Sequence, residues 1–273
     1  MSDPQFVSSP EPVATAAVPP LTYGPGVIPP RQDEYDSVPP LSQGQRVIDT
    51  FFAPSRTFAD IRRNRSWWLP YILLVLCSLV FGAAVQKRVG PDTLAENAIR
   101  NNSSQAAKFE NMPADQRVGA MKMTSTFMRV GLFSGPISFL IFPAFLALLI
   151  WVGCNFILGG SSTYPGMFAV AMYAALPALL FYAIIIATLF AGDPENFNIN
   201  NMAGTNIGYY LPTGTGPFLK SLLSSIDVFS IWQAFLLGLG GAIVARVKRS
   251  SSLAMVFGVW LLFILVKAGI AAI

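Results

Sequence analysis

A long uncharged stretch constrains this chain more than any other feature. No Asp, Glu, Lys or Arg occurs from Val130 to Gly192, and helices exposed to water cannot tolerate such a run. Within it, only the Gly-Gly-Ser-Ser-Thr segment at residues 159–163 can form a turn. The apolar segment on each side is long enough to cross a hydrocarbon layer about 30 Å thick as a helix. The sequence therefore predicts a membrane hairpin.

Three further apolar segments have a similar length, so we expect five membrane spans. Only 12% of the residues are charged, which is about half of the fraction found in soluble domains. The predicted fold class is all-α, a polytopic membrane protein whose residues 67–273 form a bundle of five transmembrane helices. The predicted spans are residues 67–86, 130–158, 164–191, 226–245 and 252–273.

The composition excludes several classes of function. The chain has no histidine, so serine-histidine-aspartate, cysteine-histidine and histidine-ligated zinc sites cannot be built. Cys77 and Cys154 lie in apolar runs, where we expect core thiols rather than a disulfide. The net charge of +4 is spread over the segments outside the spans, which does not fit a nucleic-acid partner. We predict no catalytic, cofactor-binding or metal-binding residues.

The N-terminal segment differs sharply from the rest of the chain. Residues 1–41 contain ten prolines and few aromatic residues, a composition that cannot bury enough apolar area to fold. We predict a disordered, proline-rich cytosolic tail. Its Pro-Pro doublets favour local polyproline II, so a ligand for an aromatic groove is the alternative to a solvated spacer.

Residues 42–66 are predicted to form two short amphipathic helices, divided at Pro54. Basic and aromatic residues follow the apolar positions, which suits a headgroup layer that contains anionic lipid. A cap that packs on the protein itself is the alternative interpretation. The apolar positions are Val47, Ile48, Phe51, Phe52, Phe58 and Ile61, and the predicted membrane-interface anchors are Arg62, Arg63, Arg65, Trp67 and Trp68.

Loop charges predict the orientation. Arg246, Lys248 and Arg249 crowd the short link between the last two spans, which the positive-inside rule places in the cytosol, together with the N-terminus. Residues 87–129 would then be external, although they contain seven basic residues. We expect this segment to be helical, with Asp92 as an N-cap and a second helix that runs from Pro113 into the second span.

Few polar or ionisable side chains occur within the spans. Asp227 and Lys267 lie near the predicted outer boundary, where we expect them to act as interface anchors, with Asp227 as a helix N-cap or a partner of Lys267. Prolines at 136, 143 and 177 predict kinks. The remaining candidates for polar contacts within the membrane are Asn155, Trp232 and Gln233, and the candidates for helix packing are Gly131, Gly135, Gly238, Gly241, Ala242 and Ala245.

Two strings resemble the Yip domain family. These are FFAPSRTFADIRRNRSWWLP at Phe51–Pro70 and DVFSIWQAFLLGLGGAIV at Asp227–Val244, the latter followed by a basic link and a final span that contains Trp260. The resemblance implies a five-helix bundle, a cytosolic N-terminus and no enzymatic activity, with roles in vesicle traffic and membrane shaping for eukaryotic members. The chain lacks the eukaryotic Asp-Leu-x-Gly-Pro-Leu signature, which indicates the bacterial branch and argues against binding of a small GTPase.

Our first functional hypothesis is a non-enzymatic scaffold or membrane-organising, trafficking-type protein. The expected location is a bacterial cytoplasmic (inner) membrane, or the Golgi or endoplasmic reticulum membrane in a eukaryote. The expected partners are the lipid bilayer, further copies of the chain and other membrane proteins. The alternative is a transporter or channel subunit for a small neutral or apolar solute, which would need a polar cavity lined by Asn155 or Gln233.

Overall fold

The computed structural model describes residues 39–272 except 102, 200 and 213. The predicted tail therefore lies almost wholly outside the described residues, and the fold is that of the unit that begins at Pro40. Its α-helices are α2 (Gln43–Phe52), α3 (Pro54–Ile61), α4 (Trp68–Arg88), α5 (Pro91–Arg100), α6 (Ser103–Glu110), α7 (Ala114–Leu132), α8 (Gly135–Val152), α9 (Tyr164–Ala174), α10 (Pro177–Ala191), α11 (Pro217–Ser225), α12 (Val228–Ala245) and α13 (Arg249–Ala271).

Five helical segments are long and apolar enough to cross a membrane. They are Trp68–Arg88, Gly135–Ile157, Tyr164–Ala191, Val228–Ala245 and Arg249–Ala271. The described residues form no β-strand, only an isolated bridge between Asn206 and Asp227. The all-α, five-span prediction is confirmed, and each boundary lies within a few residues of its expected place, apart from the start of the second span.

The second span begins differently from its prediction. The helix expected to run from Pro113 without interruption ends at Leu132, and α8 begins at Gly135. Pro136 occupies the first turn of α8, where its missing N–H costs nothing and its ring prevents continuation of the preceding helix. The N–H groups of Phe133 and Ser134 bond instead to carbonyls three residues back. Pro143, by contrast, lies inside α8, which continues through it.

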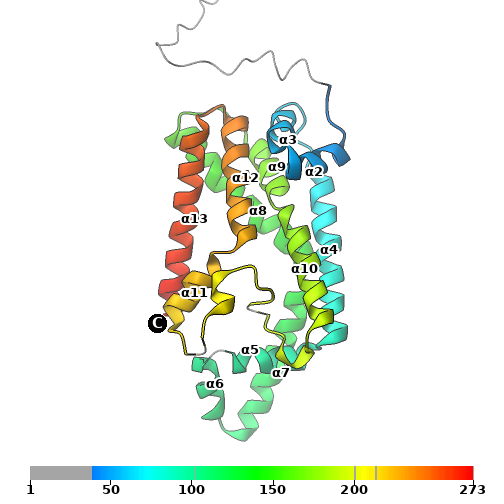
Figure 1. Ribbon diagram of the computed structural model, residues 1–273, viewed down its shortest axis with the longest axis vertical. Helices are drawn as coiled ribbons and strands as arrows, with labels where there is room; N and C mark the ends of the chain where they lie inside the picture. The colour runs from blue at the N-terminus through cyan, green and yellow to red at the C-terminus, as the bar shows by residue number, and fades with distance from the viewer. Residues whose placement is uncertain (1–38, 102, 200, 213, 273) are drawn as a thin grey trace, which may run out of the picture. The chain divides into compact units, whose positions relative to one another are not determined.

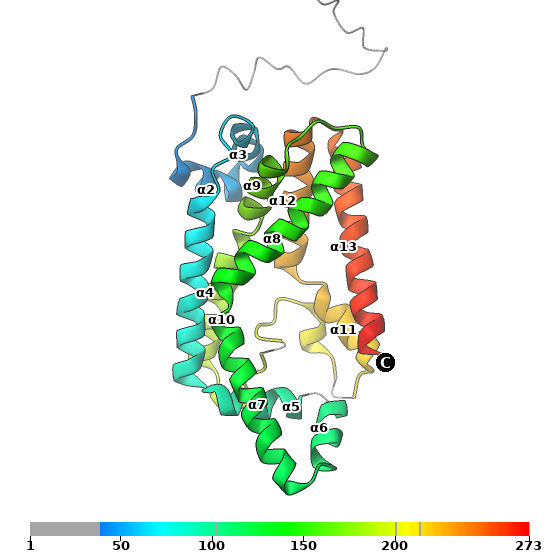
Figure 2. The same cartoon turned by 180° about the vertical axis from the view of Figure 1, so that it is seen from behind.

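The third span is interrupted at the same kind of place. The segment divides into α9 and α10 around Ala175 and Leu176, and Pro177 opens the second helix. The second span also ends in a π-helical turn, Gly153–Ile157. In Figure 2, α8 runs obliquely across the helices behind it, whereas α4 and α13 run closer to the vertical axis of the view.

Two apolar clusters form the core. One joins α3, α8, α9 and α12 and includes Phe58, Tyr173 and Leu236. The other joins α4, α5, α7 and α10, with Phe197 of the loop that follows α10. More than half of α12 (56%) is buried, against 17% of α13. We conclude that α12 is the central helix and that α13 packs at the edge.

The two ends of the bundle carry different elements (Figure 1). At one end lie α2, α3, the turn between α8 and α9 and the link between α12 and α13, where the N–H of Ser161 bonds to the carbonyl of Ala245 at 3.0 Å. At the other end lie α5, α6 and the start of α7. The Asn97 amide donates to the Phe197 carbonyl at 3.0 Å, which ties α5 to the loop after α10. We call the first end inner and the second outer.

The predicted N-cap of α5 is wrong. Gly90, with φ of +84°, is the N-cap residue, and Asp92 lies in the first turn of the helix. Pro91 at the first helical position explains the shift, because proline is favoured there. The Asp92 carboxylate still complements the positive end of the helix dipole.

Candidate functional site

The strongest candidate site is the inner cap, which we define as residues 42–67, comprising α2, α3 and the segment that leads into α4. Its first helix starts with a capping box, in which Ser42 and Gln45 bond reciprocally to each other's backbone N–H groups at 2.9 and 3.2 Å. Pro54 starts α3 at its first helical position. The two helices and the division at Pro54 lie where the sequence predicts them.

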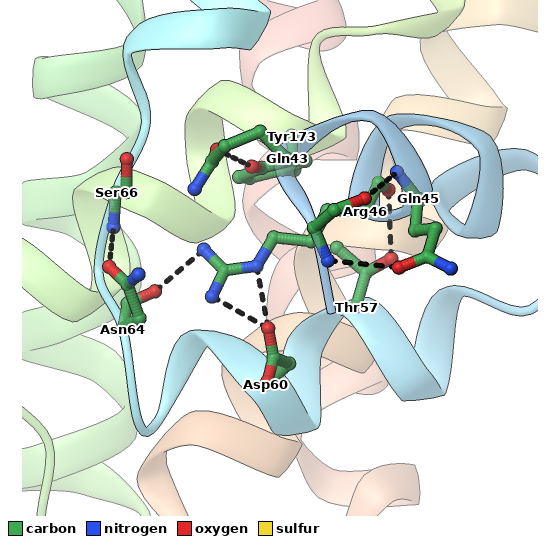
Figure 3. Close-up of polar contacts among 9 residues, drawn as sticks. Gln43, Gln45, Arg46, Thr57, Asp60, Asn64, Ser66 and Tyr173 are labelled. Carbon is green, nitrogen blue, oxygen red and sulfur yellow. Dashed lines mark hydrogen bonds and ion pairs between the residues drawn. The ribbon is translucent and has the colours of Figure 1, made fainter. Parts of the chain in front are cut away.

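A buried ion pair holds the inner cap together (Figure 3). The Arg46 guanidinium is 2.6 Å from one carboxylate oxygen of Asp60, and the exposed fractions of the two side chains are only 1% and 6%. A second guanidinium nitrogen of Arg46 donates to the carbonyl of Asn64 at 2.9 Å. These bonds connect α2 with the end of α3 and with the segment that follows it.

The backbone of Arg46 is part of the same network. Its carbonyl accepts hydrogen bonds from the hydroxyls of Thr50 at 2.7 Å and Thr57 at 2.9 Å. The hydroxyl of Tyr173 on α9 donates to the Gln43 side chain at 3.0 Å, a contact that Figure 3 also shows. The network therefore links α2 and α3 to each other and to a membrane span.

Apolar contacts dock one face of the inner cap on the bundle. Phe58 and Ile61 are fully buried in the core cluster that joins α3, α8, α9 and α12. A Cβ atom at Gly240 of α12 would lie 2.9 Å from the Phe58 ring, so α3 and α12 are in close contact. Phe51 meets Trp232 edge to face with ring centroids 5.8 Å apart. For this face, the structure favours the alternative in which the cap packs on the protein itself.

The opposite face of α2 is apolar and exposed. Ile48 and Phe52 lie one helical turn apart and are 58% and 84% exposed. Arg56 is exposed nearby and is 3.4 Å from Asp49. An apolar pair beside basic side chains is the pattern of a helix that lies in a membrane interface. The inner cap thus has one face on the protein and one face free for lipid.

The structure places the predicted anchors along the same region. Trp67 packs edge to face on Phe168 at 5.0 Å and on Tyr71 at 5.9 Å, whereas Trp68 is half exposed. Arg63 and Arg65 are exposed and Arg62 is half-buried. At the outer end, Asp227 caps α12 by accepting from the Phe229 N–H at 2.8 Å, and Lys267 donates to the Ser225 hydroxyl at 3.0 Å rather than to Asp227.

The predicted packing residues lie at helix contacts with one exception. Gly135 lies against Ser78 of α4, Gly238 against Leu253 of α13 and Gly241 against Ile150 of α8. Ala242 and Ala245 are buried. A Cβ atom at Gly131 would meet nothing within 4 Å, so Gly131 makes no close helix contact among the described residues.

The three polar candidates within the spans have separate surroundings. The Asn155 side chain accepts from the Ser162 N–H at 2.9 Å and donates to the Ser162 carbonyl at 3.0 Å, which closes the turn between α8 and α9. Trp232 contacts the inner cap through Phe51. Gln233 lines an apolar groove between α8, α12 and α13.

Sequence reasoning missed the ion pair of Arg46 and Asp60. Each residue occupies an ordinary polar position on an amphipathic helix, and no pattern in the sequence marks either as buried. The described residues contain no group of three or more His, Cys, Asp or Glu side chains that could hold a metal ion.

Comparisons with known proteins agree with this architecture. The family model described as the Yip1 domain matches residues 48–270. "Membrane protein YknW" of Bacillus subtilis (strain 168) is 25% identical over 216 residues, which cover 77% of this chain and 84% of that protein. No solved structure matches.

Proposed function

Because this chain belongs to the Yip1 domain family, we propose that it is a non-enzymatic scaffold at the cytosolic face of a bacterial cytoplasmic membrane. Yip1 domain proteins are not known enzymes. The observation that carries the proposal is the docked inner cap: the buried ion pair of Arg46 and Asp60 joins its two helices, and the buried side chains of Phe58 and Ile61 pack them on the bundle.

The cytosolic placement of the inner end is part of the proposal. It is supported by the basic link Arg246, Lys248 and Arg249, which lies at the same end as the inner cap, because short basic loops remain in the cytosol. A bacterial membrane is supported by the Bacillus relative, whose name describes a membrane protein.

The exposed face of α2 would contact lipid. Ile48 and Phe52 supply apolar area, and the exposed Arg56 and Arg65 supply positive charge near it. Such a combination favours the anionic headgroups of the cytosolic leaflet. If lipid covers this face, the N-terminal tail and the bundle surface are available to bind other proteins. The partners that we propose are other membrane proteins and a second copy of the chain.

Crosslinking in intact cells tests the scaffold role. The full chain is compared with a variant that lacks residues 1–38 and with Phe52→Glu, and Gln116→Glu on exposed α7 serves as the control for added charge. We expect the deletion to lose specific crosslinked proteins, Phe52→Glu to weaken the same crosslinks, and Gln116→Glu to retain them. An unchanged set of crosslinked proteins in both test variants contradicts the proposal. Uptake of a neutral solute by the purified protein in liposomes would instead favour the transport alternative.

A further inference from the structure

A cavity of about 280 Å³ lies at the break between α7 and α8, where the second span begins. We call it the break pocket. It is bounded by α4, by the end of α7 and the start of α8, by α10, and by Ile199 and Met202 of the loop after α10. It is distinct from the inner cap, which lies at the other core cluster, and the scaffold proposal makes no use of it.

The break pocket is lined by hydroxyl groups. Ser134 and Ser138 come from the break itself, Ser78 from α4 and Tyr182 from α10. Ser78 donates to the Val75 carbonyl at 2.8 Å, and Ser134 donates to the Gly131 carbonyl at 2.8 Å. Among the described residues, the Tyr182 hydroxyl has no hydrogen-bond partner, although its ring packs on Phe81 at 5.3 Å. An unsatisfied hydroxyl in hydrocarbon is costly, so Tyr182 can gain a bond from an occupant.

The depth of the break pocket indicates how an occupant reaches it. Ser78, on the α4 wall, lies about 15 Å along the helix from Trp68 at about 1.5 Å per residue, whereas Phe127 of α7 and Met202 of the loop after α10 line the side toward the outer end. The pocket therefore extends from within the membrane spans toward the outer end. No charged side chain occurs among the described residues that line it. An occupant must therefore be neutral, and it must dissolve in the membrane.

Gly131 borders the break pocket. It lines the cavity from α7, and a Cβ atom at this position would enter open space. A larger side chain there would meet no neighbouring helix and would narrow the space at this border. The residue that the sequence assigned to helix packing thus determines how much space an occupant has.

We propose that the break pocket binds a neutral, lipid-soluble molecule whose head carries a hydroxyl or carbonyl oxygen that bonds to Tyr182. The cavity volume of about 280 Å³ lies near the lower limit of about 300 Å³ for ligand pockets. It therefore accommodates a compact head, while an attached hydrocarbon tail lies among the lipids. Phe81, Phe139 and Met128 supply the apolar walls.

Photolabelling of the full chain in phospholipid nanodiscs tests this proposal. The probe is a decanol that carries a diazirine, and labelled residues are mapped by mass spectrometry. We expect saturable labelling of peptides that contain residues 127–139 and Tyr182. Gly131→Leu should reduce this labelling at least tenfold, whereas Gly119→Leu on the same helix, also with open space around the glycine, should leave it unchanged.

Two further variants test the proposal in case Gly131→Leu does not fold. Gly131→Ala should reduce the labelling by less, and Tyr182→Phe should weaken probe affinity about two- to tenfold, as expected for one hydrogen bond. Competition by 1-decanol, 2-decanone or both supports the proposal and identifies which oxygen the site accepts. Equal competition by decane, or full labelling of both Tyr182→Phe and Gly131→Leu, overturns it.

Discussion

Arg46 and Asp60 form an ion pair at 2.6 Å although 14 residues separate them in the sequence and both are almost completely buried. Two charges in such a place are costly to desolvate, and they are tolerated only because each is hydrogen-bonded. Here the Asn64 carbonyl accepts a further guanidinium hydrogen, and Tyr173 of α9 donates to Gln43 on the same helix as Arg46. The pair therefore makes α2 and α3 one rigid unit, which Phe58 and Ile61 dock on the membrane bundle.

Breaking this pair should destabilise the protein strongly. Asp60→Ala leaves a buried guanidinium without its partner, and we expect the free energy of unfolding to fall by about 3–5 kcal/mol. Thermal unfolding of the purified protein in detergent measures the effect. Arg65→Ala is the matched control, because Arg65 is exposed and removal of an exposed charge changes stability by at most about 1 kcal/mol. Equal melting temperatures for the two variants would show that the pair does not hold the cap.

Replacing both charges should largely restore stability. Arg46→Met together with Asp60→Leu removes the desolvation cost of both groups and fills similar space, and such replacements of buried ion pairs are often neutral or stabilising. We expect the double variant to melt well above Asp60→Ala. The proposal of a specific structural pair would be contradicted if the double variant were less stable than the single one.

A side chain at Gly240 should displace α3. A Cβ atom there would lie 2.5 Å from a methyl group of Val170 and 2.9 Å from the Phe58 ring. We expect Gly240→Val to cost about 1–3 kcal/mol through overpacking and to make residues 62–66 more sensitive to protease. Gly258→Val on α13 is the control, because a Cβ atom there meets nothing within 4 Å. If the protease sensitivity of Gly240→Val were unchanged, the contact between Phe58 and Gly240 would not be what docks α3 on the bundle.

Asn155 should contribute to the turn between α8 and α9. Its side chain makes three hydrogen bonds with Ser162, to the N–H, the hydroxyl and the carbonyl. Asn155→Ala leaves these groups unsatisfied, so we expect a loss of about 1–3 kcal/mol in the same thermal assay. Asn111→Ala removes only one exposed bond to the Ala107 carbonyl and should change little. A loss no larger than that of Asn111→Ala would mean that the turn forms without the amide.

Sequence patterns predicted the spans because hydrophobic length is a property of contiguous residues. Pro54 and Pro177 also marked real helix divisions, since proline acts locally on the backbone. Pro143 did not, because neighbouring helices can accommodate a proline within a span. Pro136 predicted a kink, but the complete end of α7 at Leu132 was not predicted, because the apolar run continues through this point and hydropathy does not report where one helix ends and the next begins.

The inner-cap ion pair and the break pocket were missed for a different reason. Arg46 and Asp60 meet only after α2 and α3 have folded against each other, and Tyr182 faces a cavity created by a break in another span. Such contacts depend on tertiary packing, and the spacing of residues along a single sequence does not predict which distant residues will meet. Gly131 shows the same limit, since a small residue on a helix permits either close packing or an open space.

Reporter fusions at residues 110, 205 and 249 and at the C-terminus test the central claim most directly, because it requires five crossings with the inner cap in the cytosol. Alkaline phosphatase reports an external position, and green fluorescent protein reports a cytosolic one. We predict that the fusion at residue 249 is cytosolic and that the other three are external. A fusion at residue 110 or at the C-terminus that reports the same side as residue 249 would contradict the account.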